Sequence, residues 1–234
     1  MAGGLDDGGR EAGLTREDMD RFAMHSHHKA VAARERLAEE IVPVYLPPKF
    51  EKVIEHDDGP REGQSMEALA KLKTVFERKT GAVTAGNASQ VTDGAVAMLV
   101  MTETRAAQEG LEPLGILTGY TYAGCDPKRM GLGPVYAMQP LMERHQLDST
   151  DVDYWEINEA FAAQVLACDR EMQLDHGKLN VNGGSIALGH PIGCTGARIV
   201  TTLLHEMVRR ESKLGLATLC VSGGMGGALI LERV

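Results

Sequence analysis

Three polar, glycine-rich junctions in the second half of the sequence carry side chains suited to acid–base chemistry. Asn158 and Glu159 follow a short apolar run, His190 lies within the glycine-rich segment 180–198, and Cys220 opens the run CVSGGMGG. Glycines let a ligand approach the backbone closely. Each junction alone is more often a structural turn or a buried thiol, but their coincidence favours acid–base catalysis beside an oxyanion site.

Helices and strands alternate around these junctions, which fall where the elements end. The spacing of apolar residues predicts helices over 134–145, 160–172 and 196–210, and strands over 114–122, 154–157, 216–221 and 228–231. Interleaved strands and helices indicate an α/β layered fold. In such folds functional groups gather at the ends of strands, where the three junctions lie.

The first part of the chain predicts a flexible arm followed by a capped helix. Residues 1–13 are rich in glycine and charge, which is typical of an arm, and Thr15 with Asp18 resembles a capping box for a helix that runs to about Arg36. EEIVPVYLPP is a short β-like run in which Pro43 favours an edge strand.

The middle of the chain predicts a loop, two short helices and a buried strand. The loop spans 55–64, Ser65 can cap a helix through Leu72, and a second helix covers 103–108. The continuous apolar run 95–101 predicts a strand covered on both faces.

Composition bounds the class of protein. The 234 residues are 43% apolar, enough for a sizeable core, and 24 basic against 33 acidic residues give a net charge of −9, which argues against nucleic-acid binding. No apolar run reaches the roughly 18 to 20 residues of a membrane span. The first residues are polar and acidic, unlike an export signal, so we expect a soluble, cytoplasmic protein.

Cysteine and histidine spacing predicts no metal site. The four cysteines at 125, 168, 194 and 220 form no Cys-x-x-Cys pair and indicate a reducing compartment. His25, His27 and His28 point in different directions on a helix, which favours a solvated face over a metal site.

Several long motifs resemble the thiolase family, whose members interconvert 3-ketoacyl-CoA and acetyl-CoA. The resemblance covers nearly the whole chain after the first dozen residues. Its motifs are AGNASQVTDGA at 85–95, MGLGPVYA at 130–137, NEAFAAQ at 158–164, NVNGGSIALGHPIGCTGAR at 180–198 and CVSGGMGG at 220–227. It implies a thiolase-like layered α/β fold, here the C-terminal half with part of the loop domain.

The resemblance assigns the roles of the three junction residues. Cys220 matches the general base or acid at the carbon next to the thioester, and His190 matches the histidine that activates the nucleophile and helps to bind the thioester oxygen. Asn158 matches the residue that holds a water in that oxyanion site. A thiolate near an imidazolium would have a lowered pKa, so Cys220 is expected to be a usable base near neutrality.

The resemblance also implies where coenzyme A binds. Ser89 matches a pantetheine contact, with Ala85, Ala160 and Phe161 lining the same tunnel, and Arg61 lies where a cation often meets the nucleotide end. Coenzyme A is a substrate, and no further cofactor and no metal are implied.

Thiolases carry a second, acylated cysteine, and none of Cys125, Cys168 and Cys194 has its sequence surroundings. We therefore expect 1–82 to be a partial loop domain with a flexible arm and 83–122 to be a segment that would complete the absent N-terminal half. Residues 123–234 are expected to form the C-terminal α/β domain. The strand at 95–101 would then lose its neighbours and become an exposed apolar edge.

Three hypotheses follow. The first is an acyl-CoA acetyltransferase portion whose nucleophilic cysteine sits on a missing segment or a partner chain, in a homo-oligomer or with that partner. The second is a catalytically inactive coenzyme A-binding or assembly module. The third is a truncated reading frame.

Overall fold

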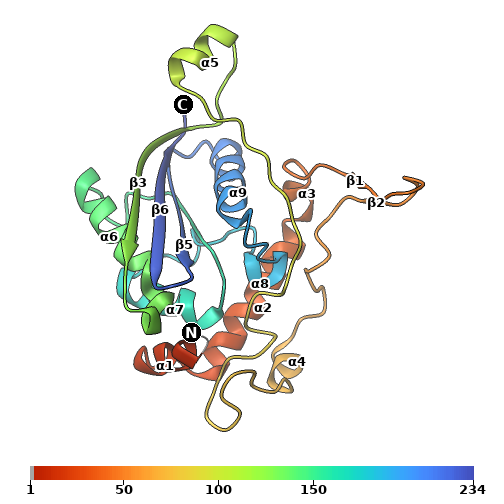
Figure 1. Cartoon of the computed structure of the whole chain (residues 1–234), viewed down its shortest axis with the longest axis vertical. Helices are drawn as coiled ribbons and strands as arrows, with labels where there is room; N and C mark the ends of the chain where they lie inside the picture. Colours follow the sequence, from red (N-terminus) through yellow and green to blue (C-terminus); the bar gives the residue numbers. More distant parts are fainter. Residues whose placement is uncertain (1–2) are drawn as a thin grey trace.

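A mixed four-stranded sheet lies at the centre of the structure, and helices cover both of its faces (Figure 1). The structure is a computed structural model that describes residues 3–234. In sheet order the strands are β3 (Ile116–Gly124), β6 (Met225–Glu232), β5 (Leu214–Val221) and β4 (Tyr154–Ile157). β3 and β5 both pair antiparallel to β6, whereas β4 pairs parallel to β5.

Three helices form the outer layers of this sheet. One face is covered by α6 (Gly133–His145) and α7 (Ala162–Met172), and the opposite face by α9 (Thr195–Arg209). The resulting α/β layered fold agrees with the architecture predicted from the alternating pattern. No helix within residues 3–234 has both the length and the hydropathy needed to cross a membrane.

The alternation of side chains along β5 divides the core between the two faces. Leu216 packs with the fully buried Trp155 beneath α6 and α7, while its neighbour Ala217 packs against Leu203 of α9. Successive strand residues point to opposite faces, so an uninterrupted apolar strand such as β5 is stable only when both faces are covered.

A long helix ties the irregular first half of the chain to this core. α2 (Arg16–Ala32) begins at Thr15, where the side chains and backbones of Thr15 and Asp18 form the predicted capping box. Met19 and Ala23 of α2 pack against Ala162 at the start of α7. The remaining elements are short: α1 (Gly3–Glu11), α3 (Arg34–Leu37), β1 (Val44–Tyr45), β2 (Val53–Ile54), α4 (Met66–Ala70), α5 (Glu103–Glu109), η1 (Pro127–Leu132) and α8 (Ser185–Leu188).

The predicted flexible arm is wrong for the part that the structure describes. Residues 3–11 form α1, and the buried Asp6 accepts hydrogen bonds from the backbone N–H groups of Ala82 (2.7 Å) and Val83 (3.1 Å). This anchor lies more than seventy residues away in the sequence and is invisible to local composition. Residues 1 and 2 of the predicted arm lie outside the described part of the chain.

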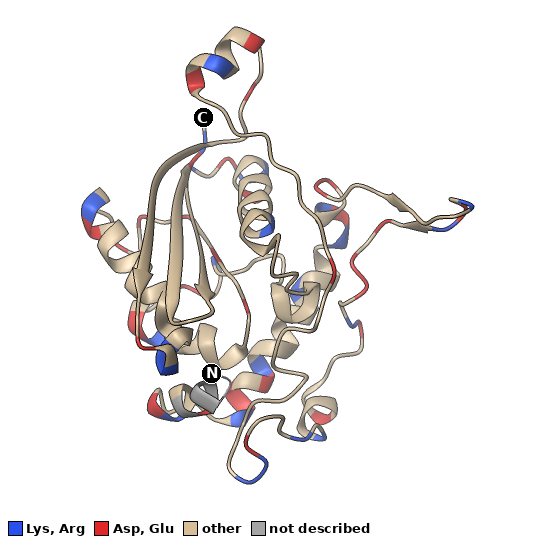
Figure 2. Ribbon diagram, in the orientation of Figure 1, with Lys and Arg blue, Asp and Glu red and all other residues tan. Residues whose placement is uncertain are grey.

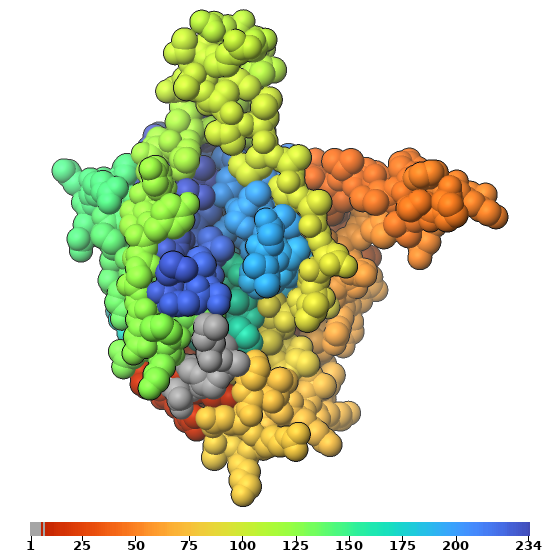
Figure 3. Space-filling model, in the orientation of Figure 1, coloured from red at the N-terminus to blue at the C-terminus, as the bar shows by residue number. Residues whose placement is uncertain are grey.

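The strand predicted at 95–101 is also wrong. These residues form no strand, and Leu99 and Val100 are 80% and 76% exposed. The segment lies on the surface alongside the last two helices before β5 (Figure 3). An apolar run forms a strand only when a neighbour supplies hydrogen-bond partners, and no described strand pairs with this one.

The remaining predicted elements are confirmed with small shifts at their ends. The helix 160–172 begins at Ala162, and 196–210 begins and ends one residue earlier. The β-like run contains only the two residues of β1, paired with β2, and Ser65 caps α4 through the N–H of Ala68 (3.2 Å).

Charged residues occur mainly on helix ends and loops around the sheet (Figure 2).

Candidate active site

The end of β4 brings Asn158 beside the strand that carries Cys220. Because β4 and β5 are parallel, their carboxyl ends meet at the same edge of the sheet. The ladder continues one residue past β4, where the backbone N–H of Asn158 donates to the carbonyl of Thr218 (2.9 Å). Cys220 follows two residues later on β5, so the amide and the thiol arise from adjacent strands at one edge.

A strained loop between α8 and α9 places His190 at this edge. Gly189, which precedes it, has φ of +102°, and a Cβ there would lie 2.5 Å from the side chain of Thr92. The hydroxyl of Thr92 accepts a hydrogen bond from the backbone N–H of His190 (3.2 Å). Only glycine adopts this backbone readily, so Gly189 determines where the imidazole lies.

The imidazole of His190 contacts Asn158 on one side and Thr195 on the other. The Nδ2 atom of Asn158 lies 3.4 Å from Nε2, and Nδ1 lies 2.8 Å from the hydroxyl oxygen of Thr195. That hydroxyl donates its single hydrogen to the carbonyl of Pro191 (2.9 Å), so it can only accept from Nδ1. Nδ1 therefore carries the proton, and Nε2 presents a lone pair toward the amide.

The charge state of His190 suits a proton acceptor. Burial lowers the pKa of His190 below its ordinary value, and the positive charge of Arg198 lowers it further. Both effects disfavour imidazolium. At neutral pH the ring is therefore neutral, with Nε2 free to take a proton.

The thiol of Cys220 is protonated at neutral pH, contrary to the expected lowered pKa. The side chain is 6% exposed, and burial raises the pKa of Cys220 to about 11. A backbone hydrogen bond opposes this shift, and the neighbouring Cys125 adds to it. The expected stabilisation by imidazolium is lost because His190 is neutral.

The other three cysteines are also weakly acidic. Burial raises the pKa of each of Cys125, Cys168 and Cys194, and Cys168 is completely enclosed. All four thiols are free. A reactive cysteine needs a lowered pKa, so none of them has the environment of an activated nucleophile.

Two buried carboxyl groups support the site from beneath. Burial raises the pKa of Glu156 to about 8 and also raises the pKa of Glu159. Glu159 accepts hydrogen bonds from the side chains of Ser26 (2.6 Å) and Asn180 (2.8 Å). Glu159, the residue after Asn158, therefore links α2 to the loop before α8.

Ser89, Ala160 and Phe161, three of the residues predicted to line the pantetheine tunnel, lie close together. The backbone N–H of Ser89 donates to the carbonyl of Ala160 (3.0 Å), and Ala88 forms a β-bridge with Phe161. Ala160 is buried, whereas Ala85 is exposed a few residues before Ser89. The segments 87–89 and 160–162 thus lie side by side although about seventy residues separate them.

Arg61 lies in the preceding loop with its side chain exposed. Its backbone N–H donates to Nδ1 of His27 (3.3 Å), and the nearby Gly59 lies against Gln90, next to Ser89. The predicted solvated histidine face is wrong for His27, which is 3% exposed because it packs beneath this loop. No cluster of potential metal ligands occurs among the described residues.

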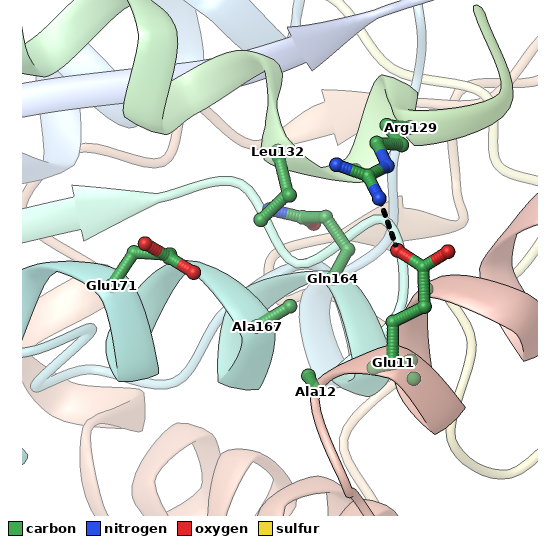
Figure 4. Close-up of a pocket in the computed structure, with 11 residues that line it drawn as sticks. Glu11, Ala12, Arg129, Leu132, Gln164, Ala167 and Glu171 are labelled. Atoms are coloured by element: carbon green, nitrogen blue, oxygen red, sulfur yellow. Dashed lines mark ion pairs between the residues drawn. The ribbon is translucent and has the colours of Figure 1, made fainter. Parts of the chain in front are cut away.

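A cavity of about 380 Å³ lies between α1, η1 and α7 (Figure 4). An ion pair between Arg129 and Glu11 (2.9 Å) crosses it, and Gln164 contributes a buried carbonyl oxygen without a hydrogen-bond partner. None of Asn158, His190 and Cys220 lines this cavity. It is therefore separate from the candidate active site.

Sequence reasoning missed four side chains that complete the site. Ser185, Thr195 and Arg198 lie within the glycine-rich segment 180–198, but their residue types alone indicate no role in the site. Thr92 had no local signal, since its contact with His190 spans 98 residues. Polar residues at fixed spacing from His190 were the available clue for Thr195.

Two family models match the chain, and together they span most of it. The model described as "Thiolase, C-terminal domain" matches residues 111–233, and "Thiolase, N-terminal domain" matches residues 6–104. The expectation that the chain is a C-terminal portion alone is therefore wrong in part, because residues 6–104 match the N-terminal domain.

Curated relatives and solved structures agree with these matches. The chain is 49% identical over 228 residues to an acetyl-CoA acetyltransferase of Cupriavidus necator and 48% identical over 228 residues to that of Escherichia coli, covering 96% of this chain and 58% of each relative. Human mitochondrial 3-ketoacyl-CoA thiolase in complex with CoA superposes with a TM-score of 0.96 at 38% identity, covering 100% of this chain and 59% of that one. The Bacillus anthracis acetyl-CoA acetyltransferase gives 0.94 at 43% identity, covering 99% and 59%. The chain thus spans under three fifths of the length of these relatives.

Proposed function

This chain belongs to the thiolase family, and we propose that it carries the proton-transfer part of an acyl-CoA acetyltransferase site. The reaction interconverts 3-ketoacyl-CoA plus CoA with acyl-CoA plus acetyl-CoA. The observation that supports the proposal is the contact of 3.4 Å between Asn158 and His190 at the end of β4, beside the strand β5 that carries Cys220.

Cys220 is proposed to move the proton at the carbon next to the thioester. In the cleavage direction the acylated cysteine bonds to the 3-keto carbon and keeps the acyl group, the carbon–carbon bond breaks to leave the enolate of acetyl-CoA, and the thiol of Cys220 protonates the enolate carbon. The raised pKa keeps the thiol protonated and so suits this step. In condensation the thiolate removes the same proton.

His190 and Asn158 are proposed to activate the nucleophile and to stabilise the oxyanion that forms on the thioester oxygen. The unprotonated Nε2 of His190 can take the proton of an attacking thiol, after which the imidazolium can donate to the thioester oxygen. The side-chain N–H of Asn158, which points toward His190, is proposed to retain a water beside the thioester oxygen. A preorganised donor at a developing oxyanion is often the largest single contribution to catalysis.

Coenzyme A is proposed to lie along the segment 85–89, close to the start of α7. It is proposed as a substrate, and no further cofactor is proposed. Ser89 and Ala85 on one side and Ala160 and Phe161 on the other are the proposed pantetheine contacts. Arg61, exposed at the far end of this surface, is the proposed contact for the nucleotide phosphates.

The acylated cysteine is proposed to lie outside these four thiols, on a segment beyond the 234 residues. The support is the raised pKa of every thiol in the chain. The working protein is proposed to be a cytoplasmic oligomer, a setting in which free thiols persist.

The raised thiol pKa values also favour a second candidate, a coenzyme A-binding module that performs no acyl transfer. The two candidates differ in whether Cys220 exchanges a proton with bound thioester. The test is deuterium exchange into the methyl group of acetyl-CoA in D₂O, followed by mass spectrometry with the folded chain.

We expect exchange roughly 10²-fold above buffer, the typical contribution of one positioned base. Because Cys220 titrates at about 11, the rate should rise about tenfold per pH unit between pH 7 and 9. Cys220→Ala should abolish exchange, whereas Cys125→Ser is the matched control and should retain it.

Intact-mass analysis with acetoacetyl-CoA completes the experiment. We expect no acetyl adduct on the chain, and an adduct on any of its cysteines would refute the external nucleophile. Coenzyme A binding without exchange would leave the second candidate, and neither exchange nor binding would overturn both.

A further inference from the structure

The carboxamide of Asn158 is completely enclosed, and its two ends differ in chemistry. An amide can rotate by half a turn and exchange its oxygen and nitrogen, so its neighbours decide which end faces the reacting atoms. Here Oδ1 accepts a hydrogen bond from the hydroxyl of Ser185, while Nδ2 points toward Nε2 of His190. A rotated amide would place its oxygen against Nε2 of His190 and lose the N–H donor at that position.

Arg198 determines the direction of the hydrogen bond between Ser185 and Asn158. Its Nη2 atom lies 3.0 Å from the Ser185 hydroxyl oxygen, and a guanidinium can only donate. Ser185 must therefore accept from Arg198, and its single hydrogen is left for Asn158. Only the oxygen of the carboxamide can accept it, which turns Nδ2 toward His190.

The other end of the same series of contacts is equally constrained. The carbonyl of Pro191 can only accept, so Thr195 donates to it and accepts from Nδ1 of His190. Donation therefore runs in one direction from Arg198 to Pro191. A donor-only group and an acceptor-only group at the two ends leave no alternative polarity for the side chains between them.

The charge of Arg198 lies at an unfavourable end of its helix. It lies in the first turn of α9, where a positive charge opposes the helix dipole. The buried carboxyl of Glu156 lies 3.5 Å from Arg198, and the positive charge of Arg198 lowers the pKa of both Glu156 and Glu40 against the larger effect of burial. The guanidinium of Arg198 therefore lies beside Ser185 with acidic side chains near it.

We propose that Arg198 and Ser185 are positioning residues that orient the carboxamide of Asn158 and so turn its N–H toward Nε2 of His190. This inference rests on the proposed function for its catalytic consequence, but the orientation itself can be observed without any turnover. Both residues are proposed to act through Asn158 and not by contact with the substrate.

The test compares Ser185→Ala with Thr202→Val, a matched control that deletes another buried hydroxyl, on α9. Two-dimensional NMR would follow the side-chain amide of Asn158 and the ¹⁵N shifts of His190. In the parent chain we expect one amide environment and a protonated Nδ1. Ser185→Ala should broaden or shift the amide and shift the Nε2 signal of His190, because the donor that faces Nε2 is no longer fixed, whereas Thr202→Val should change neither.

Arg198→Lys provides a second variant that keeps the positive charge but loses the guanidinium fork. We expect it to disturb the Asn158 amide as Ser185→Ala does, while the pKa of His190 stays low because both the burial of the ring and the positive charge remain. Exchange into acetyl-CoA should fall about tenfold in both variants with unchanged affinity for coenzyme A, the loss expected for one misdirected hydrogen bond.

Unaltered amide and imidazole signals in folded Ser185→Ala and Arg198→Lys would overturn the positioning role. A fall in exchange no larger than that of Thr202→Val would also overturn it. If the parent chain shows no exchange, the proposed function fails, but the NMR comparison still decides the orientation.

Discussion

Replacing Glu40 by glutamine should make the protein more stable at alkaline pH. The carboxyl of Glu40 accepts a hydrogen bond from Thr202 (2.8 Å), and its second oxygen is buried without a partner. Burial raises the pKa of Glu40 to about 7 from its ordinary value of 4.5, although Thr202 and the charge of Arg198 oppose the shift. In the folded chain the group stays protonated in a range where the unfolded chain has ionised it.

The sign and size of the effect follow from proton linkage. Between pH 4.5 and about 7 the folded state binds more protons at Glu40 than the unfolded state, so the free energy of unfolding falls as the pH rises. A separation of about 2.5 pH units corresponds to about 3 kcal/mol, reduced to about 2 kcal/mol because the side chain is only partly buried. Glutamine is neutral throughout and keeps an oxygen for Thr202.

Urea unfolding at pH 4.5, 6, 7 and 8.5 would measure this difference. We expect Glu40→Gln to match the parent at pH 4.5 and to exceed its free energy of unfolding by about 2 kcal/mol at pH 8.5. Glu39→Gln, a change at the exposed neighbour, is the control and should show no such trend. Equal stability of Glu40→Gln and parent at pH 8.5 would refute the reasoning, because it would mean that Glu40 ionises in the fold at no cost.

Two further predictions concern the surface segment and the histidine loop. Leu99→Lys, a change on the exposed apolar run, should reduce concentration-dependent association in light scattering without altering the unfolding midpoint, and unchanged scattering would show that this run does not drive association. Gly189→Ala should displace His190, because the added methyl meets Thr92 at 2.5 Å in a backbone with positive φ. Deuterium exchange into acetyl-CoA should then fall at least tenfold with a native circular dichroism spectrum, whereas full exchange would mean that the loop adapts.

Local patterns predicted the regular elements around the site because their signals lie within a few residues. The capping box at Thr15, the apolar alternation of β5 and the glycine turn after Cys220 each involve neighbours in sequence. The α/β layered fold followed from them, and the long motifs indicated the family. Two elements escaped this reasoning because distant partners decide them: Asp6 anchors α1 to residues 82 and 83, and the run 95–101 has no strand to pair with.

The sequence by itself determined which chemical groups the site contains: a thiol, an imidazole and an amide at three glycine-rich junctions. Only the tertiary structure decided their states. Burial, which depends on the packed layers, makes Cys220 a weak acid instead of the expected thiolate, and Arg198 helps to keep His190 neutral. The direction of each hydrogen bond depends on donor-only and acceptor-only groups that folding brings together, and no spacing in the sequence records that direction.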